Sequence, residues 1–143
     1  MKMNKDFDVL DIKGRKFLYS KEVEDHFFNP RNVLDEKIDL GQFNAKSEIG
    51  SPACGDVMKV YLLIDPESKK ILDFKWKTFG CASAIASTSI LSEMAIGQSI
   101  EQAYKITANE IVKALGGLPK KKIHCSVLGD QALRAAIDDF RKN

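Results

Sequence analysis

The chain has 143 residues, 44% of them apolar, which suffices for one domain with a substantial core but not for two of ordinary size. Its 22 basic and 20 acidic residues leave a net charge of +2, which excludes a strong general attraction to nucleic acid or membrane phosphates. The apolar stretches fall short of the roughly 20 residues that a membrane span needs, and the N-terminal segment lacks the apolar core of a signal peptide and is too acidic for a transit peptide. We therefore expect a cytoplasmic protein with no nucleic-acid or membrane partner.

The N-terminal part of the chain divides into a lead-in and the start of a domain. Residues 1–18 carry scattered charge with little periodicity, so we expect a mobile lead-in before a single domain that spans residues 19–143. The first predicted helix is Ser20–Phe28. Ser20 can cap its N-terminus with its hydroxyl group, and Asn29-Pro30 ends it because proline cannot continue a helix.

Three strands are predicted next, at Gln42–Ile49, Asp56–Asp65 and Ile71–Phe79. The alternation of apolar and polar residues is weak in the first and clear in the other two. The residues expected on the apolar face are Met58, Val60, Leu62 and Ile64 in the second strand, and Leu72, Phe74, Trp76 and Thr78 in the third. This pattern predicts an antiparallel meander with one face exposed to solvent.

Helices follow the strands. The segment Cys81–Ile96 is rich in small and aliphatic residues and ends at Gly97. Two short helices are expected at Ser99–Tyr104 and Thr107–Leu115, and a longer amphipathic one at about Ser126–Phe140. The order predicts an α+β fold, in which helices pack on one face of a small three-stranded antiparallel sheet.

The three cysteines indicate thiol or metal chemistry, because an odd number cannot pair completely within one chain. Cys54 falls in a predicted loop before a strand, Cys81 at a strand-to-helix junction, and Cys125 just before the last predicted helix. Their separations of 27 and 44 residues exclude a local pair of the Cys-x-x-Cys kind. A shared site would therefore have to be assembled by the fold.

Three cysteines leave one position open in a metal or cluster site with four ligands. Asp56 and His124 each lie close to a cysteine in sequence and could supply an oxygen or nitrogen ligand, which would make a bound cluster easier to release. Lys122 could favour the thiolate form of a nearby cysteine or compete for an empty metal position. Taken singly, all three also fit ordinary turn, buried or surface roles. His26, within the first predicted helix, is interpreted as structural.

These residues belong to motifs that strongly resemble the IscU/NifU-type iron-sulfur cluster scaffold family. The resemblance runs from about Tyr19 to the C-terminus. The matching segments are Tyr19-Ser20, Asp25-His26, Asn29-Pro30-Arg31-Asn32, Pro52-Ala53-Cys54-Gly55-Asp56-Val57-Met58, Phe79-Gly80-Cys81, Ser83-Ala84-Ile85-Ala86-Ser87 and Lys122-Ile123-His124-Cys125-Ser126.

The resemblance implies that Cys54, Cys81 and Cys125 hold a transient [2Fe-2S] cluster at one end of the sheet, with Asp56 and His124 modulating or completing the site. Iron would bind there, sulfur would come as persulfide from a cysteine desulfurase, and a ferredoxin-like protein would donate electrons. A frataxin-like protein is a further expected partner, and apo iron-sulfur proteins would receive the cluster. Such a scaffold turns over no substrate of its own. We expect Cys125 to accept the persulfide because of its charged neighbours.

One segment departs from the family pattern. Many members carry Leu-Pro-Pro-Val-Lys before the last cysteine, where a DnaK-like chaperone binds, whereas this chain has Leu118-Pro119-Lys120-Lys121-Lys122. The difference puts dependence on such a chaperone in doubt and leaves the ligands unchanged.

Two alternatives stay open at this point. One is a zinc-dependent sulfur acceptor of the SufU type, in which zinc occupies a similar site; His124 and the short spacing between Cys81 and Cys125 argue against it. The other is a thiol enzyme with Cys125 as nucleophile and His124 as base. Neighbours in sequence rarely point at each other, and no third orienting residue is evident.

Overall fold

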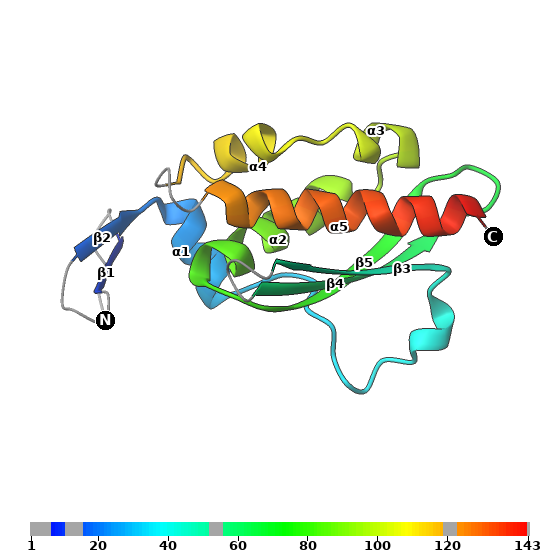
Figure 1. The fold of residues 1–143 in the computed structure, drawn as a ribbon, viewed down its shortest axis with the longest axis horizontal. Coiled ribbons are helices and arrows are strands. Elements are labelled where there is room, and N and C mark those ends of the chain that lie inside the picture. The colour runs from blue at the N-terminus through cyan, green and yellow to red at the C-terminus, as the bar shows by residue number, and fades with distance from the viewer. Residues whose placement is uncertain (1–6, 11–15, 52–55, 119–122, 143) are drawn as a thin grey trace.

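The computed structural model describes residues 7–10, 16–51, 56–118 and 123–142. Its centre is an antiparallel sheet of three strands in the order β3-β4-β5, with β3 at Ala45–Ser51, β4 at Asp56–Ile64 and β5 at Ile71–Phe79. Figure 1 shows the helices gathered over one face of this sheet, with the longest helix crossing its whole length. The predicted α+β fold is confirmed.

The inner face of β4 follows the predicted alternation, because the side chains of its four expected apolar residues are all fully buried. In β5 the prediction is wrong at its start. Ile71 is fully buried and Leu72 is 56% exposed. Ile64 pairs with Ile71 and Leu63 with Asp73, so Leu72 is an extra residue that a β-bulge inserts into the ladder. From Phe74 onward the predicted face is restored, with Phe74 and Trp76 both buried.

Helix α1 spans Lys21–Phe28 as predicted, and the Ser20 hydroxyl accepts a hydrogen bond from the amide of Val23 at its N-terminus. Beyond α1 the chain runs along the free side of β5, where Leu34 N donates to Trp76 O at 2.7 Å and Trp76 N donates to Asn32 O at 3.2 Å. It then crosses the face of the sheet opposite the helices and forms the short 3-10 helix η1 (Leu40–Gln42) before β3 begins.

The remaining helices match their predicted positions with one exception. Helices α2 (Ala82–Ala95), α3 (Ile100–Tyr104) and α4 (Ala108–Ala114) each begin one residue after the predicted start, because Cys81, Ser99 and Thr107 are their N-cap residues. Helix α5 spans Ile123–Lys142 and begins three residues before the predicted start. None of those three extra residues is glycine or proline, so the helix can extend through them.

Helices α2 and α5 pack closely at Gly129. A Cβ atom at this position would lie 3.3 Å from the Thr88 hydroxyl oxygen and 3.4 Å from a methyl group of Leu91. The Thr88 hydroxyl in turn lies 3.6 Å from the sulfur of Met58 in β4. Helix α5, helix α2 and the sheet are therefore closely packed against one another at this point.

The lead-in contains secondary structure that the sequence did not predict. Strands β1 (Phe7–Leu10) and β2 (Lys16–Tyr19) pair antiparallel in a two-stranded sheet of their own, directly before α1. This hairpin lies beside α1 at one end of the molecule (Figure 1). The predicted mobility of residues 1–18 and the domain boundary at residue 19 stay predictions.

Candidate functional site

One end of the central sheet carries most of the predicted site. Ser51 at the end of β3 pairs with Asp56 at the start of β4, and Val57 pairs with Phe79 at the end of β5. Cys81 follows β5 by two residues, so it lies at this same end. Cys54 lies outside the described residues, in the connection between the paired ends of β3 and β4.

The first turn of α5 reaches the same end. Helix α5 runs antiparallel to β3, since Lys46 N donates to a carboxylate oxygen of Asp139 and the Ser47 hydroxyl donates to Ala132 O, earlier in the helix. The nine residues from Ala132 back to Ile123 cover about 13 Å of helix, which matches the length of β3 beyond Ser47. Figure 1 shows the N-terminus of α5 and that of α2 at the same end of the sheet.

His124 and Cys125 therefore lie within the first turn of α5. The prediction that they precede the helix is wrong, because α5 already begins at Ile123. Their side chains, and that of Asp56 in β4, lie outside the described part of the structure, as does all of Lys122.

Cys81 is the predicted ligand whose side chain the structure describes. It is the N-cap residue of α2, with φ −80° and ψ 174°, and its side chain is partly exposed. The sulfur makes no capping hydrogen bond and lies 3.0 Å from the Ser83 hydroxyl oxygen. Because the positive end of a helix dipole favours negative charge, this position suits a thiolate that binds metal.

The complete set of ligands stays a prediction. Among the described side chains, no three His, Cys, Asp or Glu residues form a group that could hold a metal ion. Of the five predicted ligands, those side chains include Cys81 and none of the other four. The donor chemistry and the placement of Cys81 fit a thiolate-bound iron-sulfur cluster.

His26 has a structural environment, as its position in α1 predicted. Its ring is buried, and Nδ1 lies 2.7 Å from the Ser89 hydroxyl of α2. Burial is the main cause that lowers the pKa of His26, and the nearby Arg31 guanidinium lowers it further. The ring is therefore neutral at physiological pH.

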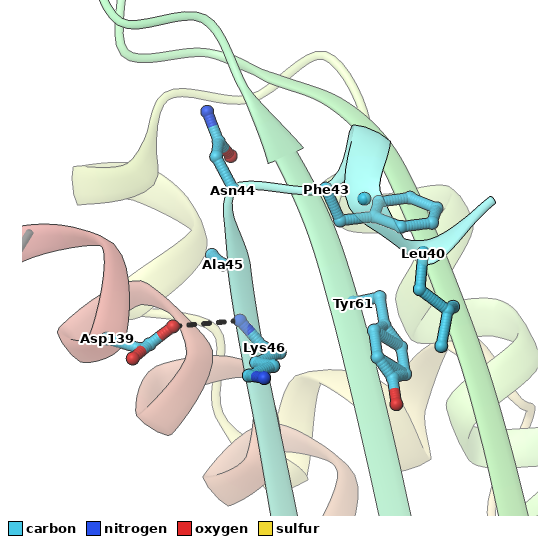
Figure 2. Close-up of a pocket in the computed structure, with 8 residues that line it drawn as sticks. Leu40, Phe43, Asn44, Ala45, Lys46, Tyr61 and Asp139 are labelled. Atoms are coloured by element: carbon cyan, nitrogen blue, oxygen red, sulfur yellow. Dashed lines mark hydrogen bonds between the residues drawn. The ribbon is translucent and has the colours of Figure 1, made fainter.

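One cavity lies away from the cysteine end. It has a volume of about 430 Å³ and is lined by the start of β3, the η1 segment, Tyr61 and Asp139. Figure 2 shows Asp139 on one side of the β3 backbone and the side chains of Leu40, Phe43 and Tyr61 on the other. Ala45 and Lys46 begin β3, and Asn44 directly precedes them, whereas Cys81 and the first turn of α5 lie at the other end of the sheet. This cavity is therefore no part of the predicted site.

A family model for the NifU-like N-terminal domain matches residues 18–143 of the chain. The chain belongs to this NifU-like family. It is 50% identical over 129 residues to the iron-sulfur cluster assembly scaffold protein IscU 1 of Archaeoglobus fulgidus, and the match covers 88% of this chain and 79% of that relative. It is 46% identical over 126 residues to IscU of Aquifex aeolicus, with coverage of 87% and 76%.

Two solved structures share the fold. The N-terminal NifU-like protein of Brucella abortus superposes with a TM-score of 0.65 at 19% identity, over 87% of this chain and 94% of the other. A protein of Fervidobacterium islandicum, described as a cluster assembly scaffold for the SUF system, has a TM-score of 0.61 at 23% identity, with coverage of 83% and 96%. In the described part of this NifU-like chain, no helix is both long and apolar enough to cross a membrane.

Proposed function

We propose that this chain is a scaffold on which an iron-sulfur cluster is assembled and from which the cluster passes to apo-proteins. The observation that supports this function most strongly is the position of Cys81, at the N-terminus of α2 and at the end of the sheet that the first turn of α5 also reaches. The names of relatives that are 46–50% identical over most of the chain support the same function. The protein acts as a carrier and does not turn over a substrate.

The cargo is a transient [2Fe-2S] cluster. Thiolates of Cys54, Cys81 and Cys125 bind the two iron ions, and Asp56 or His124 supplies the remaining contact. A carboxylate or imidazole binds iron less persistently than a fourth thiolate would, which favours release. Cluster assembly and transfer take place in the cytoplasm.

Sulfur arrives through a cysteine desulfurase. The Cys125 thiolate attacks the outer sulfur of the desulfurase persulfide, so that a new S–S bond forms and the desulfurase cysteine leaves as a thiolate. Lys122 and His124 favour the thiolate form of Cys125. Two electrons from a ferredoxin-like donor then reduce the transferred sulfur to sulfide, and a frataxin-like protein assists the complex.

The test is anaerobic incubation of the purified protein with ferrous iron, cysteine, a cysteine desulfurase and dithiothreitol as the electron donor, followed by addition of an apo-ferredoxin. A visible cluster that moves to the ferredoxin supports the scaffold function. Tight zinc binding with persulfide formation and no cluster would instead support a zinc-dependent sulfur acceptor. The variant Cys125→Ser should lose persulfide formation, and persulfide on it at the level of the unaltered protein would contradict the assignment of the acceptor.

A further inference from the structure

Ser83 lies next to Cys81 and is fully buried. Its burial distinguishes it from a serine on the exposed surface of a helix. Its hydroxyl oxygen is 3.0 Å from the Cys81 sulfur, within the first turn of α2. The two residues are two positions apart, so the contact holds the sulfur against the end of the helix.

Two other buried hydroxyls of α2, those of Ser87 and Thr88, differ from that of Ser83 in their partners. The Ser87 and Thr88 hydroxyls both donate to the carbonyl oxygen of Ala84, in the preceding turn of the same helix. Ser83 is the second residue of α2, so no helical turn precedes it. Its hydroxyl is directed to the cysteine at the N-cap instead.

Whether Ser83 or Cys81 donates this hydrogen bond depends on whether the sulfur carries a proton. A thiol can donate or accept, but a thiolate or a metal-bound sulfur has no proton and can only accept. When Cys81 binds iron, the Ser83 hydroxyl is therefore the donor. Hydrogen bonds to ligand sulfurs withdraw negative charge from them and fix their orientation, which tunes both metal affinity and the electronic properties of the site.

We propose that Ser83 is a positioning residue, which donates a hydrogen bond to the Cys81 sulfur in the metal-bound state and thereby slows release of the cluster. This inference rests on the proposed scaffold function. It predicts that Ser83→Ala weakens metal binding by about tenfold, the lower end of the range found when such supporting partners are removed. The variant should also pass its cluster to apo-ferredoxin faster.

Cobalt(II) is a suitable probe because thiolate-bound cobalt has a charge-transfer band. The full chain is titrated anaerobically with cobalt(II) in competition with a chelator, and the band is recorded. Loss of the hydrogen bond raises the energy of the sulfur lone pair, so in Ser83→Ala the band should move to longer wavelength while affinity falls. Ser83→Thr restores a hydroxyl and should restore both values.

Ser87→Ala is the matched control, because it also removes a buried α2 hydroxyl but leaves the hydroxyl of Ser83 beside Cys81 in place. It should change neither the band nor the affinity. An identical band and affinity in Ser83→Ala and the unaltered protein would overturn the role of Ser83. Cys81→Ala should weaken the band, because one of three thiolate ligands is lost. A band and an affinity that are both unchanged in Cys81→Ala would instead contradict the ligand set of the proposed function, so the two failures are distinguishable.

Discussion

The Nδ1 atom of His26 in α1 lies 2.7 Å from the Ser89 hydroxyl oxygen in α2, although 63 positions separate the two residues. The same hydroxyl accepts a hydrogen bond from the Arg31 amide at 2.9 Å. Ser89 can therefore donate its proton to Nδ1, which leaves the proton of the neutral ring on Nε2, 3.4 Å from a carboxylate oxygen of Glu93. One buried hydroxyl thus joins α1, the segment after it, and α2.

Replacement of Ser89 by alanine should lower the free energy of unfolding by about 2–3 kcal/mol, because it leaves the Arg31 amide and the His26 ring without this shared partner. Urea unfolding followed by circular dichroism measures the loss. Ser87→Ala is the control, since the Ser87 hydroxyl donates to a carbonyl of its own helix, at Ala84. Equal stability of the two variants would contradict the structural role of Ser89.

The stability of the protein should fall in mild acid because of His26. Burial, followed by the charge of Arg31, lowers the pKa of His26 below its ordinary value of 6.5, while Glu93 and Asp25 oppose the shift. The unfolded chain then binds a proton more readily than the folded one, so this stability is complete above pH 6.5 and is lost as the pH falls below it, by at most about 1.4 kcal/mol per pH unit.

Urea unfolding from pH 5 to 8 tests this dependence. The variant His26→Gln should flatten the profile below pH 6.5. The chain has two histidines, so the matched control is His124→Gln, which should keep the His26 contribution. A profile that flattens only in His124→Gln would show that the pH dependence of stability comes from His124, which would contradict the prediction.

Because of the β-bulge in β5, two adjacent residues should differ in how much they contribute to stability. Ile71→Ala should cost about 2–5 kcal/mol, since a fully buried side chain is truncated. Leu72→Ala should change stability by less than about 0.5 kcal/mol, because Leu72 projects into solvent. The reverse order in a thermal or urea unfolding experiment would mean that β5 pairs in the register of simple alternation.

Cys81 occupies an N-cap position without capping the helix, so function and stability are separable there. Cys81→Asp should stabilise the apo-protein by about 0.5–1 kcal/mol, through a capping hydrogen bond and the interaction of its charge with the helix dipole. The same variant should fail to form a persistent cluster in the reconstitution assay. A less stable apo-protein would show that the cysteine side chain contributes packing that aspartate cannot replace.

Local chemistry made most of the fold predictable. Ser20 caps α1 as its side chain and sequence position predicted, and the alternation in β4 identified its buried face. Simple alternation places Leu72 on the wrong face of β5. The β-bulge that exposes it depends on the pairing with β4, and the sequence of β5 alone carries no sign of that pairing. The start of α5 was missed because no capping residue marks it. The β1–β2 hairpin is not predicted because residues 1–18 show little apolar periodicity, and pairing between two strands cannot be inferred without it.

Less of the candidate site than of the fold could be confirmed. The position of Cys81 at a strand-to-helix junction is confirmed. The ligand roles of Cys54, Asp56, His124 and Cys125 stay predictions. Ser83 was part of a recognised motif, but its burial and its contact with Cys81 depend on the packing of α2, and composition carries no signal of either.

Each outer strand of the central sheet has a contact on its open side. Residues 32–34 bond to β5 at Trp76, and the Asp139 carboxylate accepts the outward-facing amide of Lys46 in β3. Exposed strand edges are where chains pair with one another and aggregate. A foreign strand would have to displace one of these contacts before it could add to the sheet. These contacts therefore hinder unwanted association through the sheet edges, while Cys81 at the end of the same sheet stays partly exposed.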